Sequence, residues 1–359
     1  MMRWWQETER VIGRAGSRAC LAAIVAGLVA LGWGATGANA QGVFGALIAS
    51  WLFFAGVAMG AVAFRALLSV MHARWSVPLD PAAARATAFM PAAAALLAII
   101  VVAFRLWAPW AEHANPARAF WLNAPFFSIR ELVATAALFG MAHHGFRTAR
   151  DPSSKQQRPI AFAVAFCMVY CVVLSIWAID FVLGVDRDWV SSLIGPHLFV
   201  GALYSGIALV TLLSLAAGSV GEFQRAALTK LMVAFSILWI YMFWSQYLPI
   251  WYGNLPDEIG FVLERSAQPW RALYLVVVAT TFVAPFVLLL HPSSRRSRKV
   301  LAAVCVGVLA GLWLERIVLV MPSLHVAGTP VLDPRALFVA AGVLGAFVLT
   351  VGRSRRLVA

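Results

Sequence analysis

Long apolar stretches alternate with short polar connections along the whole chain. An α-helix needs about 20 apolar residues to cross a bilayer core. Ten stretches meet this requirement: residues 17–34, 43–69, 86–110, 126–146, 159–184, 193–218, 227–251, 270–290, 299–321 and 336–352. The pattern predicts an all-α integral membrane protein with about ten transmembrane helices.

Composition and charge agree with this prediction. Hydrophobic residues make up 62% of the 359 positions and charged residues 12%, whereas a soluble domain has about 25% charged residues. The net charge of +13 comes from Lys and Arg in the connections, so we expect contact with membrane lipid and none with nucleic acid.

Most basic residues lie in every second connection, which predicts the orientation of the chain. They are Arg3, Arg10, Arg14 and Arg18; Arg74 and Arg85; Arg147, Arg150, Lys155 and Arg158; Arg225; Arg295, Arg296, Arg298 and Lys299; and Arg353, Arg355 and Arg356. Because positively charged loops remain in the cytoplasm, both termini are predicted to be cytoplasmic in a bacterial inner membrane protein. Most acidic residues fall in the opposite connections.

The first apolar stretch has an alternative interpretation. A basic segment, an apolar run over residues 20–33 and the sequence Ala38-Asn39-Ala40 resemble a cleavable signal peptide. An uncleaved first helix fits the charge alternation equally well. The topology after Gln41 is the same in both cases.

Stretches two to five resemble stretches six to nine. The ends LWAPW at residues 106–110 and YLPIW at residues 247–251 correspond, and IWAIDFVL at 176–183 aligns with LWLERIVL at 312–319, which sets Asp180 against Arg316. The repeat predicts two parallel four-helix bundles. We divide the single membrane domain into residues 1–42 (N-terminal helix and loop), 43–184 and 185–321 (bundles), and 322–359 (outer loop and last helix).

Polar residues inside the apolar stretches cluster near their outer ends. They are Arg105, Arg130, Glu131, Asp180, Gln246, Glu315 and Arg316, with His197 at the same edge. A rise of 1.5 Å per residue sets them at one depth, within about 10 Å of the outer interface. Charges at this depth are expected to face the bundle interior in pairs.

This polar layer has two interpretations. In one, it is an ion-pair network that fixes the register of the helices. In the other, it lines a pocket for an amphipathic ligand. Asp180, Glu131 and Glu315 are then the candidate proton-accepting residues, and the candidate ligand-binding residues are Arg130, His197, Gln246, Tyr247, Arg105 and Arg316.

Residues 238–258 carry the most polar helix end. Pro249 is predicted to end or kink the helix, and Gly253, Asn254 and Pro256 to form a turn before an acidic loop. Tyr247, with Trp251 and Tyr252, is typical of an aromatic belt at the membrane interface.

Ligand patterns for redox cofactors and metals are not found in the sequence. The seven His residues divide between the two edges of the membrane, and the four Cys residues lie in apolar runs without a CxxCH motif. We therefore expect no haem, iron–sulfur cluster or metal bound by this chain.

Three segments carry a family resemblance. DWVSSLIGPHLFVGALY at residues 188–204, WSQYLPIWYGNLPDE at 244–258 and LERIVLVMP at 314–322 resemble ActF, an NrfD-like membrane subunit of alternative complex III. Ser191 departs from that pattern, in which Met is expected. The resemblance covers nearly the whole chain.

The resemblance implies a subunit of a bacterial quinol-oxidising complex. It implies quinol or quinone as a ligand and, as partners, a second NrfD-like membrane subunit, an iron–sulfur protein and c-type haem subunits. In that family the main quinol site belongs to the companion NrfD-like subunit, and the resemblance implies for this subunit a second quinol-binding or a proton-transfer role in the polar layer. A secondary transporter with parallel repeats and a purely structural subunit are the alternatives.

Overall fold

The computed structural model describes residues 13–37, 39–112, 116–148, 160–186, 189–253, 256–291, 297–325, 330 and 333–353. Ten helices in these ranges are long and apolar enough to cross a membrane. The predicted all-α membrane fold is thus confirmed, and each predicted stretch corresponds to one span.

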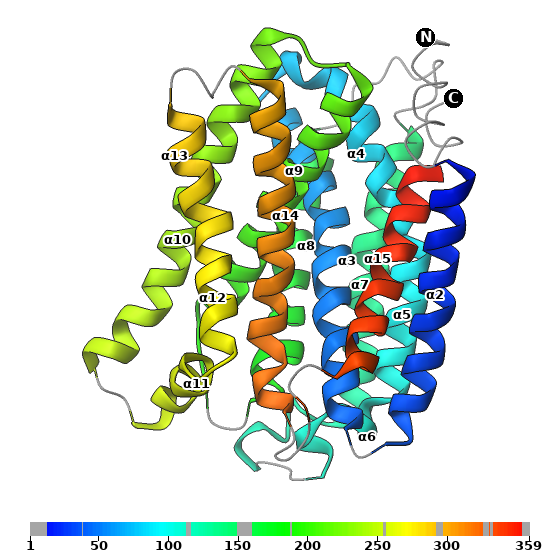
Figure 1. Cartoon of the computed structure of the whole chain (residues 1–359), viewed down its shortest axis with the longest axis vertical. Coiled ribbons are helices and arrows are strands. Elements are labelled where there is room, and N and C mark those ends of the chain that lie inside the picture. The colour runs from blue at the N-terminus through cyan, green and yellow to red at the C-terminus, as the bar shows by residue number, and fades with distance from the viewer. Residues whose placement is uncertain are drawn as a thin grey trace.

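The helices run mostly antiparallel along one common direction (Figure 1). In chain order they are α2 (Arg14–Ala35), α3 (Ala40–Val70), α4 (Asp80–Ala86), α5 (Met90–Val102), α6 (Phe104–Trp107), α7 (Ala124–Thr148), α8 (Ile160–Ala178), α9 (Ile194–Ala217), α10 (Glu222–Gly253), α11 (Pro256–Ser266), α12 (Trp270–Val278), α13 (Ala284–Leu290), α14 (Arg298–Val320) and α15 (Pro334–Arg353). Short π-helical turns extend α8 (Ile179–Leu183) and join α12 to α13 (Ala279–Val283).

The helix α3 lies at the centre and is buried along its length (Figure 1). Glycines let α9 approach it closely: a Cβ atom at Gly60 would lie 1.9 Å from the carbonyl oxygen of Ala202, and one at Gly206 would lie 2.3 Å from the backbone nitrogen of Ala61. Close packing of this kind is a main source of helix association in membranes.

Two groups of four helices surround this contact. The helices α3, α5, α7 and α8 pack in a closed ring, as do α9, α10, α14 and the span made of α12 and α13. The helices α2 and α15 pack along each other beside α3, where Gly27 and Gly342 meet backbone to backbone.

Two helix boundaries differ from the sequence prediction. The third span is interrupted at Ala103, and the indole of Trp107 donates a hydrogen bond to the carbonyl of Ile100 beside the break. Of the two effects predicted for Pro249, a helix end is not seen, because α10 continues to Gly253. Proline removes one donor and opposes one carbonyl, and four residues from the helix end this loss is tolerated.

The connection after α10 was predicted to be an acidic loop, and this prediction was wrong. Residues 256–266 form the amphipathic helix α11, with Leu263 exposed and Arg265 buried. Of the other predictions, the turn at Asn254, the basic residues 295–296 and Ala38 of the candidate cleavage site lie outside the described residues.

Candidate functional site

The membrane charges form two separate networks, one in each bundle, and not one closed layer. Asp180 was set against Arg316 by the internal repeat, yet Asp180 pairs with Arg130 and Arg316 pairs with Glu315. Asp180 and Glu315 therefore each find a cation within their own four-helix group. The repeat relates positions in the two halves and does not pair residues across them.

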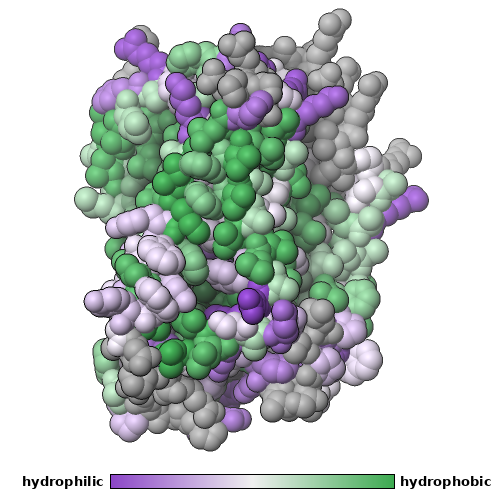
Figure 2. Space-filling model, turned by 60° about the vertical axis from the view of Figure 1, so that its left-hand side comes forward, coloured by the Kyte–Doolittle hydropathy of each residue, from purple (hydrophilic) through white to green (hydrophobic). Residues whose placement is uncertain are grey.

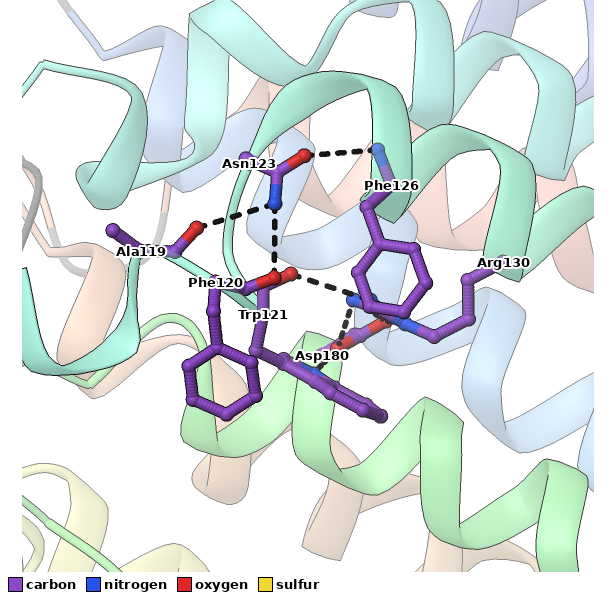
Figure 3. A network of polar contacts seen from close by, with 7 residues as sticks. All are labelled: Ala119, Phe120, Trp121, Asn123, Phe126, Arg130 and Asp180. Carbon is purple, nitrogen blue, oxygen red and sulfur yellow. Dashed lines mark hydrogen bonds and ion pairs between the residues drawn. The ribbon is translucent and has the colours of Figure 1, made fainter.

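The first network joins α7 and the end of α8 (Figure 3). The Arg130 guanidinium reaches the Asp180 carboxylate with Nη2–Oδ2 and Nε–Oδ2 distances of 2.8 and 3.0 Å. The Trp121 indole donates to Asp180 Oδ1 at 2.7 Å, and its ring lies 4.0 Å from the guanidinium carbon. Asp180 sits in the π-helical turn, a feature that is frequent at functional sites.

Glu131 is fully buried next to this pair. Neither of its carboxyl oxygens has a hydrogen bond of normal geometry to a described residue, although Asp180 lies nearby. Because Arg130 is engaged by Asp180, no cation is left for Glu131. An unpaired buried charge is expensive, so the neutral acid is the form of Glu131 that fits this environment.

The second network joins α9, α10 and α14 around Glu315. His197 Nε2 lies 2.5 Å from Glu315 Oε1, and the Trp239 indole donates to the same oxygen at 2.8 Å. Arg316 pairs with the other oxygen at 2.8 Å and donates to the carbonyl of Leu198. The Glu315 carboxylate binds Nε2 of His197. The other ring nitrogen, Nδ1, is buried and has no hydrogen-bond partner among the described residues.

Arg105 does not take part in either network. Its side chain is exposed, and the contact seen for it is with the ring of Phe104, at 5.8 Å. The predicted pairing of Arg105 in the bundle interior was wrong. A long arginine side chain near a helix end can reach the interface and keep its charge in water.

A cavity of about 470 Å³ opens beside the second network, between α10, α11 and α12. His197, Gln246 and Tyr247 line it together with Arg265, Arg271 and Tyr274, while Phe243, Ile250, Leu275 and Leu319 are among its apolar walls. Figure 2 shows a hollow in the lower half of this face, with hydrophilic side chains at its edge. Mostly apolar walls with a few polar groups are typical of small-molecule sites.

The helix α11 covers one side of the cavity and is fixed there by Arg265. The guanidinium donates to the carbonyls of Val318 and Leu319 at the end of α14, at 3.1 and 2.8 Å. It also lies 3.3 Å from the ring of Phe261, which stacks on Trp189 at 3.6 Å. Burial lowers the pKa of Arg265 to about 10, so the side chain remains charged at neutral pH.

The structure brings only part of the predicted residues together. His197, Gln246 and Tyr247 meet at the cavity, with Glu315 and Arg316 behind His197. Ser191, the departure from the ActF pattern, lies beside Gln246 with an Oγ–Oε1 distance of 3.4 Å. Arg130, Glu131 and Asp180 are not among the residues that line this cavity.

The sequence reasoning missed Trp239, Arg265 and Tyr274. Aromatic residues in apolar helices carry no signal that separates a carboxylate donor from a packing residue. Arg271, at the start of α12, also lines the cavity and was not among the predicted site residues. Among the described residues, no group of three or more His, Cys, Asp or Glu is placed to hold a metal ion.

Comparison with known proteins identifies the family. Residues 34–327 match the model of the family described as polysulphide reductase, NrfD. No curated protein sequence matches the chain. Subunits of the NrfD family are membrane components of quinone-interacting oxidoreductase complexes and typically work with iron–sulfur and other redox subunits. Because the match spans most of the chain, including both helix bundles, the protein belongs to the NrfD family.

Proposed function

We propose that the cavity between α10, α11 and α12 binds the head group of a quinol. The chain would serve as the membrane subunit of a bacterial quinol-oxidising complex of the alternative complex III type. His197 carries this proposal: its ring lines the cavity, Glu315 holds Nε2, and Nδ1 has no partner among the described residues. Such a nitrogen can accept a hydrogen bond from a quinol hydroxyl.

The polar groups around the cavity fit the oxidation of a quinol. The Nε2–H of a neutral His197 donates to Glu315, which leaves Nδ1 to accept the hydroxyl proton. Glu315 then stabilises the imidazolium, and Arg316 keeps Glu315 ionised. Gln246 and Tyr247 are placed to orient the head group, while Phe243 and Leu275 contact its ring and tail.

Electron balance requires a partner. A quinol that becomes a quinone releases two protons and two electrons, and His197 provides a route for protons only. The electrons would pass to an iron–sulfur or haem centre held by the partner subunits. We propose the assembly that the resemblance implies: a second NrfD-like subunit, an iron–sulfur protein and c-type haem subunits.

The first network has a different role in this proposal. Arg130 and Asp180 form a closely matched buried pair outside the cavity lining, which supports the helix-register interpretation for these two residues. We propose a bacterial inner membrane location with cytoplasmic termini, in which α11 and the cavity lie at the periplasmic side.

Quinol-dependent reduction of an electron acceptor by the purified complex tests the proposal. We expect His197→Gln to assemble normally and to lower kcat about 100-fold or more, because loss of a general base typically costs that much. Gln246→Ala should mainly raise KM. The matched control is His325→Gln, which changes an exposed histidine outside the cavity lining. Wild-type kcat and KM in both cavity variants would refute the site and leave a structural subunit.

A further inference from the structure

A second groove lies at the other end of the molecule, between the start of α10 and the end of α13. It encloses about 700 Å³ and is lined by charged residues at one end, Glu222, Arg225 and Lys230, and by apolar residues along its length, Val233, Ala234, Ile237, Leu289 and Leu290. Figure 1 shows that this end is opposite α11 and the proposed quinol cavity. The quinol proposal does not use it.

The charged end of the groove has an excess of cations. Arg225 is half-buried and Lys230 is exposed, and neither forms an ion pair with Glu222 or another described residue. Two cations against one carboxylate leave a net positive charge at the groove. A phosphate group is the natural counterion, because arginine and lysine both bind phosphate oxygens through charge-assisted hydrogen bonds.

The apolar part of the groove continues in one line from these cations. Ala226, Lys230, Val233 and Ile237 recur at helical spacing, so they share one face of α10. From Lys230 to Ile237 the apolar part of this face extends about 10 Å at 1.5 Å per residue, about two thirds of one leaflet of a bilayer core of about 30 Å. A chain bound here would therefore lie within one leaflet.

We propose that this groove binds one anionic phospholipid, such as phosphatidylglycerol. Its phosphate lies between Arg225 and Lys230, and an acyl chain follows α10 past Ala234 to Ile237. A transmembrane helix of a partner fits the groove less well. Contacts between membrane helices favour small residues, whereas Val233, Ile237, Leu289 and Leu290 dominate this surface. Basic pockets between transmembrane helices are known to bind anionic head groups.

Native mass spectrometry of the purified complex, with added phosphatidylglycerol or phosphatidylcholine, tests the proposal. We expect the wild type to retain phosphatidylglycerol preferentially. The Arg225→Gln and Lys230→Gln substitutions should each weaken its retention about fivefold. The control Lys299→Gln removes an exposed lysine that does not line the groove and should change nothing.

A second variant separates the groove from a general charge effect. Ala234→Trp keeps all charges but fills the acyl-chain path, and we expect it to displace the lipid from an assembled complex. Equal retention of both lipids by the wild type, or unchanged retention in Arg225→Gln, in Lys230→Gln and in Ala234→Trp, would overturn the proposal. So would a photoreactive group at position 237 that labels a protein chain and not a lipid.

Discussion

At the scale of single residues, buried carboxylates differ in whether a cation is available to them. Asp180 receives three hydrogen bonds from Arg130 and one from an indole, and Glu315 is held by an arginine, a histidine and an indole. Glu131 is equally buried but has no cation of its own. These residues are therefore expected to respond differently to the same chemical change.

Asp180→Asn is expected to destabilise the subunit by about 3 to 5 kcal/mol, because it leaves the Arg130 charge buried without a counterion. The yield and thermal stability of the purified complex measure this effect. Glu131→Gln is the matched control, since an amide of the same shape replaces a neutral acid and should be tolerated. A stable Asp180→Asn complex with slow quinol oxidation would instead assign Asp180 to proton transfer.

Asp333 couples pH to the attachment of α15. It accepts hydrogen bonds from the Arg335 side chain and backbone and from the Asn39 amide at the start of α3. The pKa of Asp333 is lowered from 3.8 to about 2, mainly by the hydrogen bond from the Arg335 side chain. Because the pKa is lowered, the ionised Asp333 carboxylate stabilises the fold above about pH 4. This stabilisation is lost as the pH falls toward 2.

Asp333→Asn is accordingly expected to lower the free energy of unfolding by up to about 2 kcal/mol at pH 7. The difference in the free energy of unfolding between Asp333→Asn and the wild type should fall to roughly half at about pH 3. Denaturant unfolding in detergent at both pH values measures it. An equal difference at pH 7 and pH 3 would show that the carboxylate charge is not responsible.

At the scale of helices, the sequence patterns predicted the transmembrane spans, which depend on the length of the apolar stretches. They did not predict the side-chain pairs between helices, which depend on how each helix is rotated about its axis. The ten spans were found because bilayer thickness sets the number of apolar residues. The pairing of Arg130 with Asp180, 50 positions apart, depends on how two helices face each other, which spacing along the chain does not determine. Arg105 shares a depth with the buried charges but faces outward for the same reason.

The helix α11 was missed because it is too short for the span criterion. Its 11 residues hold an uncharged run at 259–263 between two charged pairs, and Phe261 and Arg265 are four residues apart on one face. That spacing was visible in the sequence, but the turn residues before it and its acidic start favoured a loop. The cavity could not be predicted without this helix, because α11 forms one of its sides.

The contact between α3 and α9 is expected to tolerate no added side chain. Gly206→Ala would bring a Cβ into the backbone of Gly60 and Ala61, and overpacking of this kind typically costs about 1 to 3 kcal/mol. Gly307→Ala is the control, since a Cβ there meets no atom within 4 Å. The thermal stability of the two variants should differ clearly, and equal stability would contradict the close approach.

At the scale of the whole molecule, the two helix bundles carry unequal features. The first holds a closed ion pair, whereas the second holds a buried histidine that lines a cavity and has one ring nitrogen without a partner among the described residues. A transporter usually places polar groups and broken helices near the midplane. Here the histidine network and the cavity lie toward one end, which favours a ligand taken from the membrane over a solute carried across it.

The proposed orientation makes a testable prediction for the two ends. An impermeant thiol reagent applied from the periplasmic side should label Leu263→Cys on α11 and should not label Lys299→Cys at the start of α14. Both positions are exposed in the structure, so permeabilised membranes should allow labelling of both. The reverse pattern in intact cells would invert the topology and place the cavity at the cytoplasmic side.

The central claim is that the quinol binds in the cavity between α10, α11 and α12. Photoaffinity labelling tests this claim most directly. The purified complex is irradiated with an azido-quinone, and the labelled peptides are identified by mass spectrometry. We predict label on residues 243–275 of this chain, which supply most of the cavity lining, and its loss when excess quinol competes. Competable label found only in a partner subunit, with none on these residues, would contradict the account.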